Sequence, residues 1–240
     1  MPPASEPSAP QLSTVAVPPP RRVLVTAGPT EEPIDEVRFI GNRSSGRLGI
    51  AIAHAFADLG AEVVLALGPV RVAPPDAFGA PEHAGRVRVE RFRTSRELLD
   101  LMARELPRAE IVVMAAAVAD FRPTTRFEGK MRRGGSLTLE LEPVEDLLTT
   151  TAAFRRPEAR VFGFALEPRE RLAASARDKL ERKALAGIVA NPLETMDAAD
   201  IDATLYLRDG RARRAAPEGT RIAKDGFARW LAGEILGDAP

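Results

Sequence analysis

The chain contains no cysteine and only two histidines, His54 and His83, among its 240 residues. The absence of cysteine excludes disulfides, thiolate nucleophiles and zinc–thiolate sites, and two imidazoles are too few for a metal site built from several histidines. Neither histidine lies in a motif that suggests a Ser–His–acid triad. Chemistry that depends on a thiol or an imidazole is therefore not expected.

Long apolar runs and an excess of basic charge are also missing. No apolar run approaches the roughly 20 residues of a membrane-spanning helix, and the N-terminus lacks the charged and apolar regions of a signal peptide. Lysine plus arginine and aspartate plus glutamate both number 34, whereas a nucleic-acid-binding surface normally needs a basic excess. We therefore expect a cytoplasmic protein that binds neither membranes nor nucleic acid.

Lysine and asparagine are both scarce. Arginine accounts for 30 of the 34 basic residues, and asparagine occurs only at Asn42 and Asn191. A chain that uses arginine for most of its positive charge retains lysine by chance or where a compact ammonium is needed. The four lysines are Lys130, Lys179, Lys183 and Lys224.

The pattern of apolar residues predicts an α/β fold. Residues 1–20, rich in Pro, Ser and Ala, are expected to be a disordered tail, and 21–240 a single domain. Short apolar strands alternating with helices indicate a Rossmann-like, mostly parallel sheet with helices on both faces. A capping box at Thr94–Glu97 is expected to open the second helix, and Asp209–Gly210 a C-terminal hairpin turn. The strands are predicted near 22–27, 62–67, 87–92, 110–115, 161–166 and 187–190, and the helices near 45–59, 95–106, 145–154, 169–184 and 225–236.

A long polar loop follows the first predicted strand. It runs for 17 residues from Gly28 to Ser44, whereas such loops usually take about 2–6. "GNRSSGRL" has the glycine spacing of a P-loop, but Arg47 replaces the lysine and Leu48 the magnesium-binding hydroxyl, so a P-loop is excluded. The dinucleotide fingerprint G-x-G-x-x-G is also absent.

The end of this loop has the character of an anion site. Ser44, Ser45 and Gly46 precede a predicted helix, where free backbone N–H groups and hydroxyls favour an anion and glycine permits its close approach. A serine that only caps the helix is the alternative, but it leaves the length of the loop unexplained. The loop also carries Thr30, Asp35, Arg38 and Asn42.

These residues are similar to a known family. "VTAGPTEEPIDEVRFIGNRSSGRLG" resembles the first motif of phosphopantothenoylcysteine synthetase, also called phosphopantothenate–cysteine ligase. The resemblance continues through "GPV", "AAAVADFRP", "GKM", "GFALE" and "ARDKLERKALAGIVAN" to the C-terminal "LYLRDG". It covers 21–240 and excludes the flavin-dependent decarboxylase half of the bifunctional coenzyme A biosynthesis flavoprotein, so a separate flavin decarboxylase is a candidate partner.

The resemblance implies a nucleotide-dependent ligase. In bacterial members, 4′-phosphopantothenate attacks the α-phosphate of CTP, with Mg²⁺, and the resulting acyl-cytidylate then reacts with L-cysteine. Such a reaction needs phosphate binding, charge neutralisation and positioning rather than a thiol or an imidazole. The family further implies a homodimer and a β-flap that is used in dimerisation and in closing the active site.

The resemblance also assigns residues to roles. Asn42 is expected to act on the acyl-nucleotide intermediate and, with Thr30 and Arg38, to bind substrate, while Lys130 is expected to act catalytically from the flap. Asn191 is expected to be structural, and the metal ligands are not assigned. The nucleotide-binding residues are expected to be Ser44, Ser45, Gly46, Ala115, Ala116, Asp120, Lys130, Asp146, Phe164, Lys179 and Lys183.

The sequence departs from the family near the expected base pocket. The K-x-K-K motif reads Lys130-Met131-Arg132-Arg133, and Asn-Pro-Asp-Ile reads Val144-Glu145-Asp146-Leu147. Met114 stands where glycine is common. These changes leave ATP open as an alternative to CTP. Two other functions stay open: an NAD(P)-binding oxidoreductase, because a fold does not fix a function, and a non-catalytic nucleotide-binding relative.

Overall fold

The computed structural model describes residues 20–70 and 86–237. The expected tail, apart from Pro20, and His83 lie outside the described residues. The centre of the fold is an eight-stranded sheet with the order β13-β12-β10-β9-β6-β1-β4-β5. Its strands are β1 (Arg22–Ala27), β4 (Glu62–Leu67), β5 (Val87–Arg91), β6 (Ile111–Met114), β9 (Arg160–Glu167), β10 (Gly187–Pro192), β12 (Thr204–Leu207) and β13 (Ala212–Arg213).

Six of these strands are parallel and confirm the predicted Rossmann-like fold. Numbered along the chain, they have the order 3-2-1-4-5-6, which is that of dinucleotide-binding sheets. The chain leaves β1 in opposite directions, to β4 on one side and to β6 on the other, so the crevice between β1 and β6 is the topological switch point. β12 and β13 extend the sheet as antiparallel strands, joined by the expected turn with Gly210 at φ 88°.

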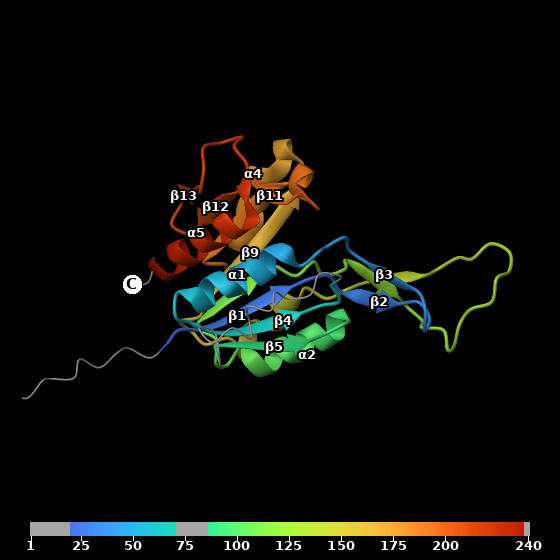
Figure 1. Ribbon diagram of the computed structural model, residues 1–240. Coiled ribbons are helices and arrows are strands. Elements are labelled where there is room, and N and C mark those ends of the chain that lie inside the picture. The colour runs from blue at the N-terminus through green and yellow to red at the C-terminus, as the bar shows by residue number, and fades with distance from the viewer. Residues whose placement is uncertain (1–19, 71–85, 238–240) are drawn as a thin grey trace, which may run out of the picture.

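Helices cover both faces of the sheet (Figure 1). On one face α1 (Arg47–Asp58) packs with α5 (Lys224–Gly237), and Phe56 and Phe227 are fully buried there. On the other face lie α2 (Ser95–Glu105) and α4 (Arg169–Arg182), with Leu98 fully buried against the sheet. Burial of each of these side chains contributes roughly 1.5–3 kcal/mol to folding stability. The helices on both faces therefore stabilise the sheet whose edge forms the crevice.

Helix α2 begins after Thr94 as predicted, but one detail of its cap and the extent of the next helix need correction. The Thr94 side chain caps α2 by accepting from the Glu97 N–H at 3.2 Å, but the Glu97 carboxylate accepts from the Arg93 N–H rather than closing the box on Thr94. The helix predicted over 145–154 breaks into α3 (Leu147–Thr150) and a 3₁₀ turn (Ala152–Phe154). Consecutive threonines explain the break, because β-branching lowers helix propensity and the Thr151 hydroxyl donates to the Leu147 carbonyl at 2.6 Å.

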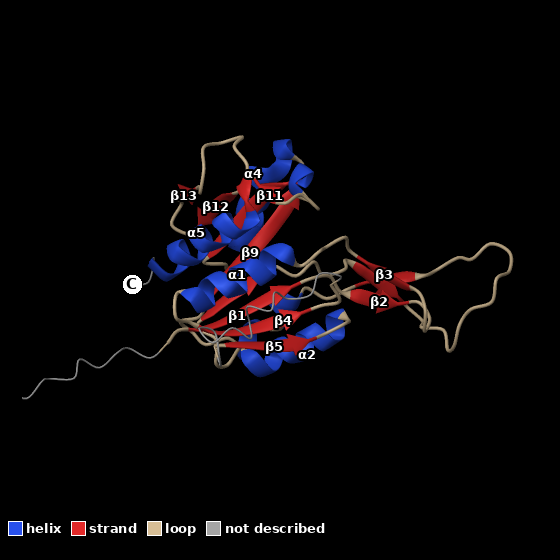
Figure 2. Ribbon diagram, in the orientation of Figure 1, coloured by secondary structure: helices blue, strands red, loops and turns tan. Residues whose placement is uncertain are grey.

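The long polar loop is not a plain loop. It folds into a hairpin of β2 (Glu31–Pro33) and β3 (Phe39–Gly41), and β7 (Phe121–Pro123) pairs with β8 (Leu141–Pro143) beside it. Residues 124–140, called the flap below, connect β7 to β8 and project from the body as a long loop (Figure 2).

The hairpin turn holds the base of the flap. The Asp35 carboxylate accepts the N–H groups of Val37 at 2.7 Å and Arg38 at 2.6 Å, and it also accepts the Met131 N–H at 3.1 Å. The Arg38 guanidinium donates to the same carboxylate at 2.5 Å. Main-chain hydrogen bonds from Phe127 to Ile34 (2.9 Å) and from Glu36 to Gly129 (3.2 Å) complete the attachment. Lys130 therefore lies between two fixed peptide groups.

We expect this attachment to depend on the charge of Asp35. Burial raises the pKa of this carboxyl, but the N–H groups of Val37, Arg38 and Met131 and the Arg38 charge more than offset it and lower the pKa to about 2. A lowered pKa means that the stabilisation is complete above the usual value near 4 and is lost as the pH falls toward 2. In Asp35→Asn, the Met131 N–H should exchange with solvent faster at neutral pH. The matched control is Glu128→Gln, an exposed flap acid; equal exchange in both variants would contradict the assignment.

Candidate functional site

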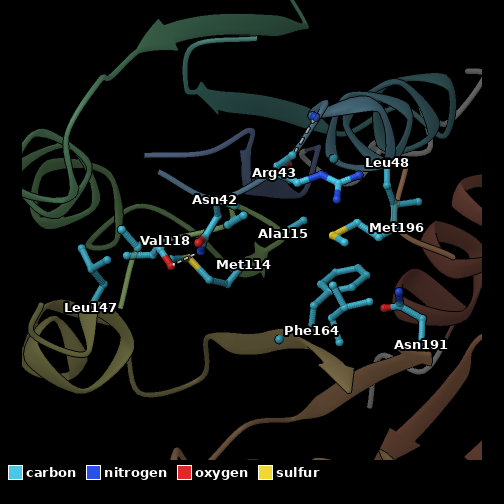
Figure 3. A pocket seen from close by; sticks show the side chains of 18 of the residues that line it. Asn42, Arg43, Leu48, Met114, Ala115, Val118, Leu147, Phe164, Asn191 and Met196 are labelled. Atoms are coloured by element: carbon cyan, nitrogen blue, oxygen red, sulfur yellow. Dashed lines mark hydrogen bonds between the residues drawn. The ribbon is translucent and has the colours of Figure 1, made fainter. Parts of the chain in front are cut away.

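A cavity of about 880 Å³ opens at the carboxyl ends of β1 and β6, the switch point of the sheet. Open α/β sheets bind their ligands at this place. Segments far apart in the sequence meet there: residues 41–49, 114–120, 144–148, 163–166 and 191–197, part of α4, and the first residue of α5. Figure 3 shows Asn42 beside Val118 on one side of the cavity and Phe164, Met196 and Asn191 on the other.

Two threonines hold the segment that follows β6. The Thr26 hydroxyl accepts the Ala116 N–H at 3.1 Å, and the Thr30 hydroxyl accepts the Ala119 N–H at 3.0 Å. Both threonines are fully buried. Substrate contact by Thr30, as expected from the sequence, is therefore not supported, because its side chain is enclosed and does not line the cavity. The Thr30 side chain instead fixes the segment whose residues line the cavity, which include Ala115, Ala116 and Asp120.

Asn42 is held against the segment that follows β6. Its side-chain amide donates to the Val118 carbonyl at 2.8 Å, and the residue is otherwise exposed to the cavity. A neutral amide in this position can bind a carbonyl or phosphoryl oxygen without adding charge. The hydrogen bond to Val118 fixes its orientation in advance.

The Ser44-Ser45-Gly46 segment differs from the predicted helix start. Helix α1 begins at Arg47, and the N-cap is Gly46 at φ 72°, without a side-chain cap. A Cβ at Gly46 would lie 2.6 Å from a methyl group of Val70, so only glycine fits both the dihedral angle and the space. Neither serine is the N-cap residue, but the Ser45 hydroxyl accepts the N–H of Arg47, the first helical residue, at 3.5 Å. The Ser44 hydroxyl accepts the Gly46 N–H at 3.3 Å, and both serines line the cavity beside the N-terminus of α1.

Two lysine–carboxylate pairs form the α3–α4 side of the cavity. Lys183 lies 2.6 Å from Asp146, which also caps α3 through the Thr149 N–H. Burial raises the pKa of Asp146, but these hydrogen bonds more than offset it, so the pKa lies below its ordinary value. Lys179 donates to Glu167 at 2.8 Å and lowers the pKa of that carboxyl. Both acids are therefore ionised near neutral pH.

Most of the expected site residues line this cavity, and three do not. Arg38 is engaged by Asp35 and lies 3.5 Å from the Met131 carbonyl, and Lys130 is exposed on the flap. With Thr30, these residues lie outside the cavity wall of the single chain. Asn191 has the structural contact expected of it, because its amide donates to the Thr195 hydroxyl at 2.8 Å, although it also lines the cavity.

Several cavity residues were not predicted from the sequence. Arg43 pairs with Asp197, and Arg47 and Lys224 line the same wall. The scarcity of lysine could have identified Lys224. The other three lysines match family positions at the nucleotide site, so the fourth was also a candidate for a position that needs an ammonium group. Nothing in the local sequence of Asp197 or Met196 indicates the cavity, since only the fold brings that segment to it.

The described residues contain neither a metal-ligand cluster nor a membrane-spanning helix. In residues 20–70 and 86–237, no group of three or more His, Asp and Glu side chains is placed to hold a metal ion. Among the same residues, no helix has the length and apolar character needed to cross a membrane.

Comparison with known proteins identifies the family. Residues 20–237 match the family model described as "DNA/pantothenate metabolism flavoprotein C-terminal domain". The chain is 39% identical over 192 residues to the coenzyme A biosynthesis bifunctional protein CoaBC of Mycobacterium tuberculosis, covering 76% of this chain and 44% of the relative. It is 41% identical over 175 residues to a protein of an unidentified prokaryote named cysteine/cysteine sulfinic acid decarboxylase, covering 72% of this chain and 46% of that protein. The chain thus spans about half the length of the curated relatives it matches.

Solved structures agree with the sequence comparison. The C-terminal domain of a CoaBC protein is 32% identical, with a TM-score of 0.73 over 91% of this chain and 97% of that domain. A Cab2 variant in complex with phosphopantothenate-cysteine has a TM-score of 0.74 over 90% of this chain and 85% of that one, but at 18% identity it shows the fold alone. The family match, the fold and the cavity agree, and the chain belongs to the DNA/pantothenate metabolism flavoprotein C-terminal domain family.

Proposed function

We propose that this chain is a phosphopantothenate–cysteine ligase of coenzyme A biosynthesis that joins 4′-phosphopantothenate to L-cysteine at the expense of a nucleoside triphosphate. The observation that carries the proposal is the cavity, which lies at the switch point of the sheet and is lined by Asn42, the Ser44–Gly46 segment, Asp120, Phe164, Lys179 and Lys183. Family membership and the likeness to a CoaBC C-terminal domain support it.

The chemistry follows from the residues of the cavity. The substrate carboxylate attacks the α-phosphate and releases pyrophosphate, and the cysteine amine then displaces the nucleoside monophosphate from the acyl-nucleotide to form an amide. Ser44, Ser45 and the N-terminus of α1 bind phosphate oxygens. Asn42 binds an oxygen of the acyl phosphate, and Asp146 with Lys183 contacts the nucleoside end.

Magnesium would be held mainly by the nucleotide. Mg²⁺ usually keeps several waters and binds one or two carboxylates together with substrate phosphates. The described residues fit this arrangement better than a protein cage, because they contain no cluster of acids but place the Asp120 carboxylate in the cavity wall. Bound magnesium would neutralise part of the phosphate charge.

A pyrophosphate-release assay tests the function. Release should require a nucleoside triphosphate and phosphopantothenate, and sustained turnover should also require cysteine. A folded chain that binds nucleotide without turnover would instead be a non-catalytic relative. Tight binding of NAD(P) with no pyrophosphate release would support the oxidoreductase alternative.

We expect CTP to be preferred over ATP, though less strictly than in relatives with Asn-Pro-Asp-Ile. Strong discrimination needs buried polar groups that the wrong base leaves unpaired, and here Val144 and Glu145 replace the first two residues of that motif. The Val144 N–H donates to the Asp120 carbonyl at 2.9 Å, so this segment lies directly beside the Asp120 end of the cavity. Values of kcat/KM for CTP and ATP measure the preference. Val144→Asn/Glu145→Pro should increase it, and a clear ATP preference in both proteins would contradict the assignment of the base pocket.

The assembly is proposed to be a homodimer in which the flap reaches the partner. Two observations support this: Lys130 lies outside its own cavity wall, and the two hairpins expose large apolar side chains. Phe39, Phe121 and Leu141 are 45%, 52% and 45% exposed, which is typical of an interaction surface when such residues lie together. Sedimentation analysis of the intact chain measures the assembly directly.

A further inference from the structure

The cavity is lined by five cationic side chains, and their partners differ. Lys179 and Lys183 pair with Glu167 and Asp146, and Arg43 pairs with Asp197. Among the described residues, no hydrogen bond or ion pair engages the side chain of Arg47 or Lys224. Of the five cations, Arg47 and Lys224 are therefore the two that are not paired with a carboxylate.

The two unpaired cations also act on each other. Lys224 is partly buried, and this burial together with the positive charge of Arg47 lowers the pKa of its ammonium group. Asp197 and Asp200 oppose this effect without overcoming it. Like charges brought together in a partly desolvated wall are unfavourable, so an anion placed between them would relieve the repulsion.

The fold fixes both residues on the rim beside the serine segment. Arg47 is the first residue of α1, directly after Ser44–Gly46. Lys224 is the first residue of α5, where β14 (Ile222–Ala223) pairs with β11 (Asp200–Ile201) and the Lys224 N–H donates to the Ala199 carbonyl at 3.1 Å. Neither position depends on the flap, so the pair is present before any closure.

We propose that Arg47 and Lys224 form an anion subsite that binds the terminal phosphates of the nucleoside triphosphate, the part released as pyrophosphate. The assignment rests on the proposed function for the identity of the ligand. The reason is charge. A triphosphate needs cations that are not already neutralised, whereas Lys179 and Lys183 are each paired with a carboxylate. The Lys179–Glu167 and Lys183–Asp146 pairs then serve the nucleoside end, while Arg47 and Lys224 neutralise the leaving group.

Binding of inorganic pyrophosphate and of CMP, measured by calorimetry, tests the subsite without catalysis. In Lys224→Met and in Arg47→Gln, affinity for pyrophosphate and CTP should fall by at least about tenfold, since hydrogen bonds to charged groups are worth roughly 1.5–3 kcal/mol. Affinity for CMP, which lacks these phosphates, should change by less than about twofold. Arg229→Gln, an exposed position on the same helix α5, is the matched control and should bind all three ligands like the original chain.

The melting temperature separates this role from a structural one. Removing an unpaired cation that is repelled by its neighbour should leave the melting temperature unchanged or raise it, whereas loss of a structural contact would lower it. Unchanged pyrophosphate affinity, or an equal loss of CMP affinity, would overturn the proposal. If the chain binds pyrophosphate through Lys224 but releases none from any nucleoside triphosphate, the subsite stands and the ligase function fails.

Discussion

Replacing Asn42 by aspartate is expected to arrest the reaction after the first half, with acyl-nucleotide accumulating. The Asn42 amide donates to the Val118 carbonyl, and a carboxylate in its place would repel that carbonyl instead. It would also repel the phosphoryl oxygen of the intermediate. Loss of one donor in an oxyanion-type site costs roughly 3–4 kcal/mol, or about 10²–10³-fold in rate.

Mass spectrometry of quenched reactions measures this arrest directly. Asn42→Ala, which removes the donor without adding charge, separates lost hydrogen bonding from repulsion and should be impaired less than Asn42→Asp. Asn191→Asp is the matched control, because Asn191 is the other asparagine of the chain and lies across the same cavity. A yield of amide product equal to that of the original chain in Asn42→Asp would remove Asn42 from the mechanism.

Replacing Lys130 by arginine is expected to lower turnover at least about tenfold although the charge is kept, and replacement by alanine about 10²–10³-fold. An ammonium group approaches a single phosphoryl oxygen as a point charge, whereas guanidinium is broader and favours a bidentate contact. The melting temperature should hardly change, because Lys130 is exposed on the flap. Steady-state kinetics of both variants test this, with Arg126→Lys as the reverse exchange at another exposed flap position.

Mixing two inactive variants distinguishes a flap that acts on its own cavity from one that acts on a partner. Asn42→Asp retains an intact flap, and Lys130→Ala retains an intact cavity. If the flap acts across a dimer, co-refolded mixtures should recover up to about a quarter of the original rate, since half the dimers are mixed and each has one complete site. No recovery, with mixed dimers verified, would place Lys130 on its own cavity. Original turnover in Lys130→Ala would end its catalytic role.

The parallel strands and their helices could be predicted because most of these strands are short and largely apolar, although β5 alternates apolar and charged residues. Ile111–Met114 is wholly buried, for example, and no alternative pattern competes with it. The hairpin of β2 and β3 could not be predicted in the same way. Its strands have three residues each and depend on distant contacts such as the Glu32 carboxylate with the Ser95 N–H. Tertiary contacts of this kind leave no local periodicity.

Site residues could be predicted where their chemistry and the family resemblance agreed. They could not be predicted where only the fold determines which side chains reach the cavity. Asn42 and Lys183 have motif positions, so they could be named in advance. Thr30 also has a motif position, but the motif does not reveal that its side chain is buried and that its hydroxyl accepts the Ala119 N–H. Lys224 has a plain helical context, and only the pairing of β11 with β14 brings it to the cavity.

The placement of the lysines gives the protein an unusual chemical property. Its four side-chain amines are all on the flap or in the cavity wall, and the rest of the surface carries arginine. Apart from the N-terminal amine, a reagent that acylates amines therefore has only site residues to modify. Lys224 should react first among the cavity lysines, because its lowered pKa leaves more of the free base and no carboxylate engages it. Ordinary lysine acylation thus becomes a selective label for this cavity, and the sites that a bound ligand protects would report where the ligand lies.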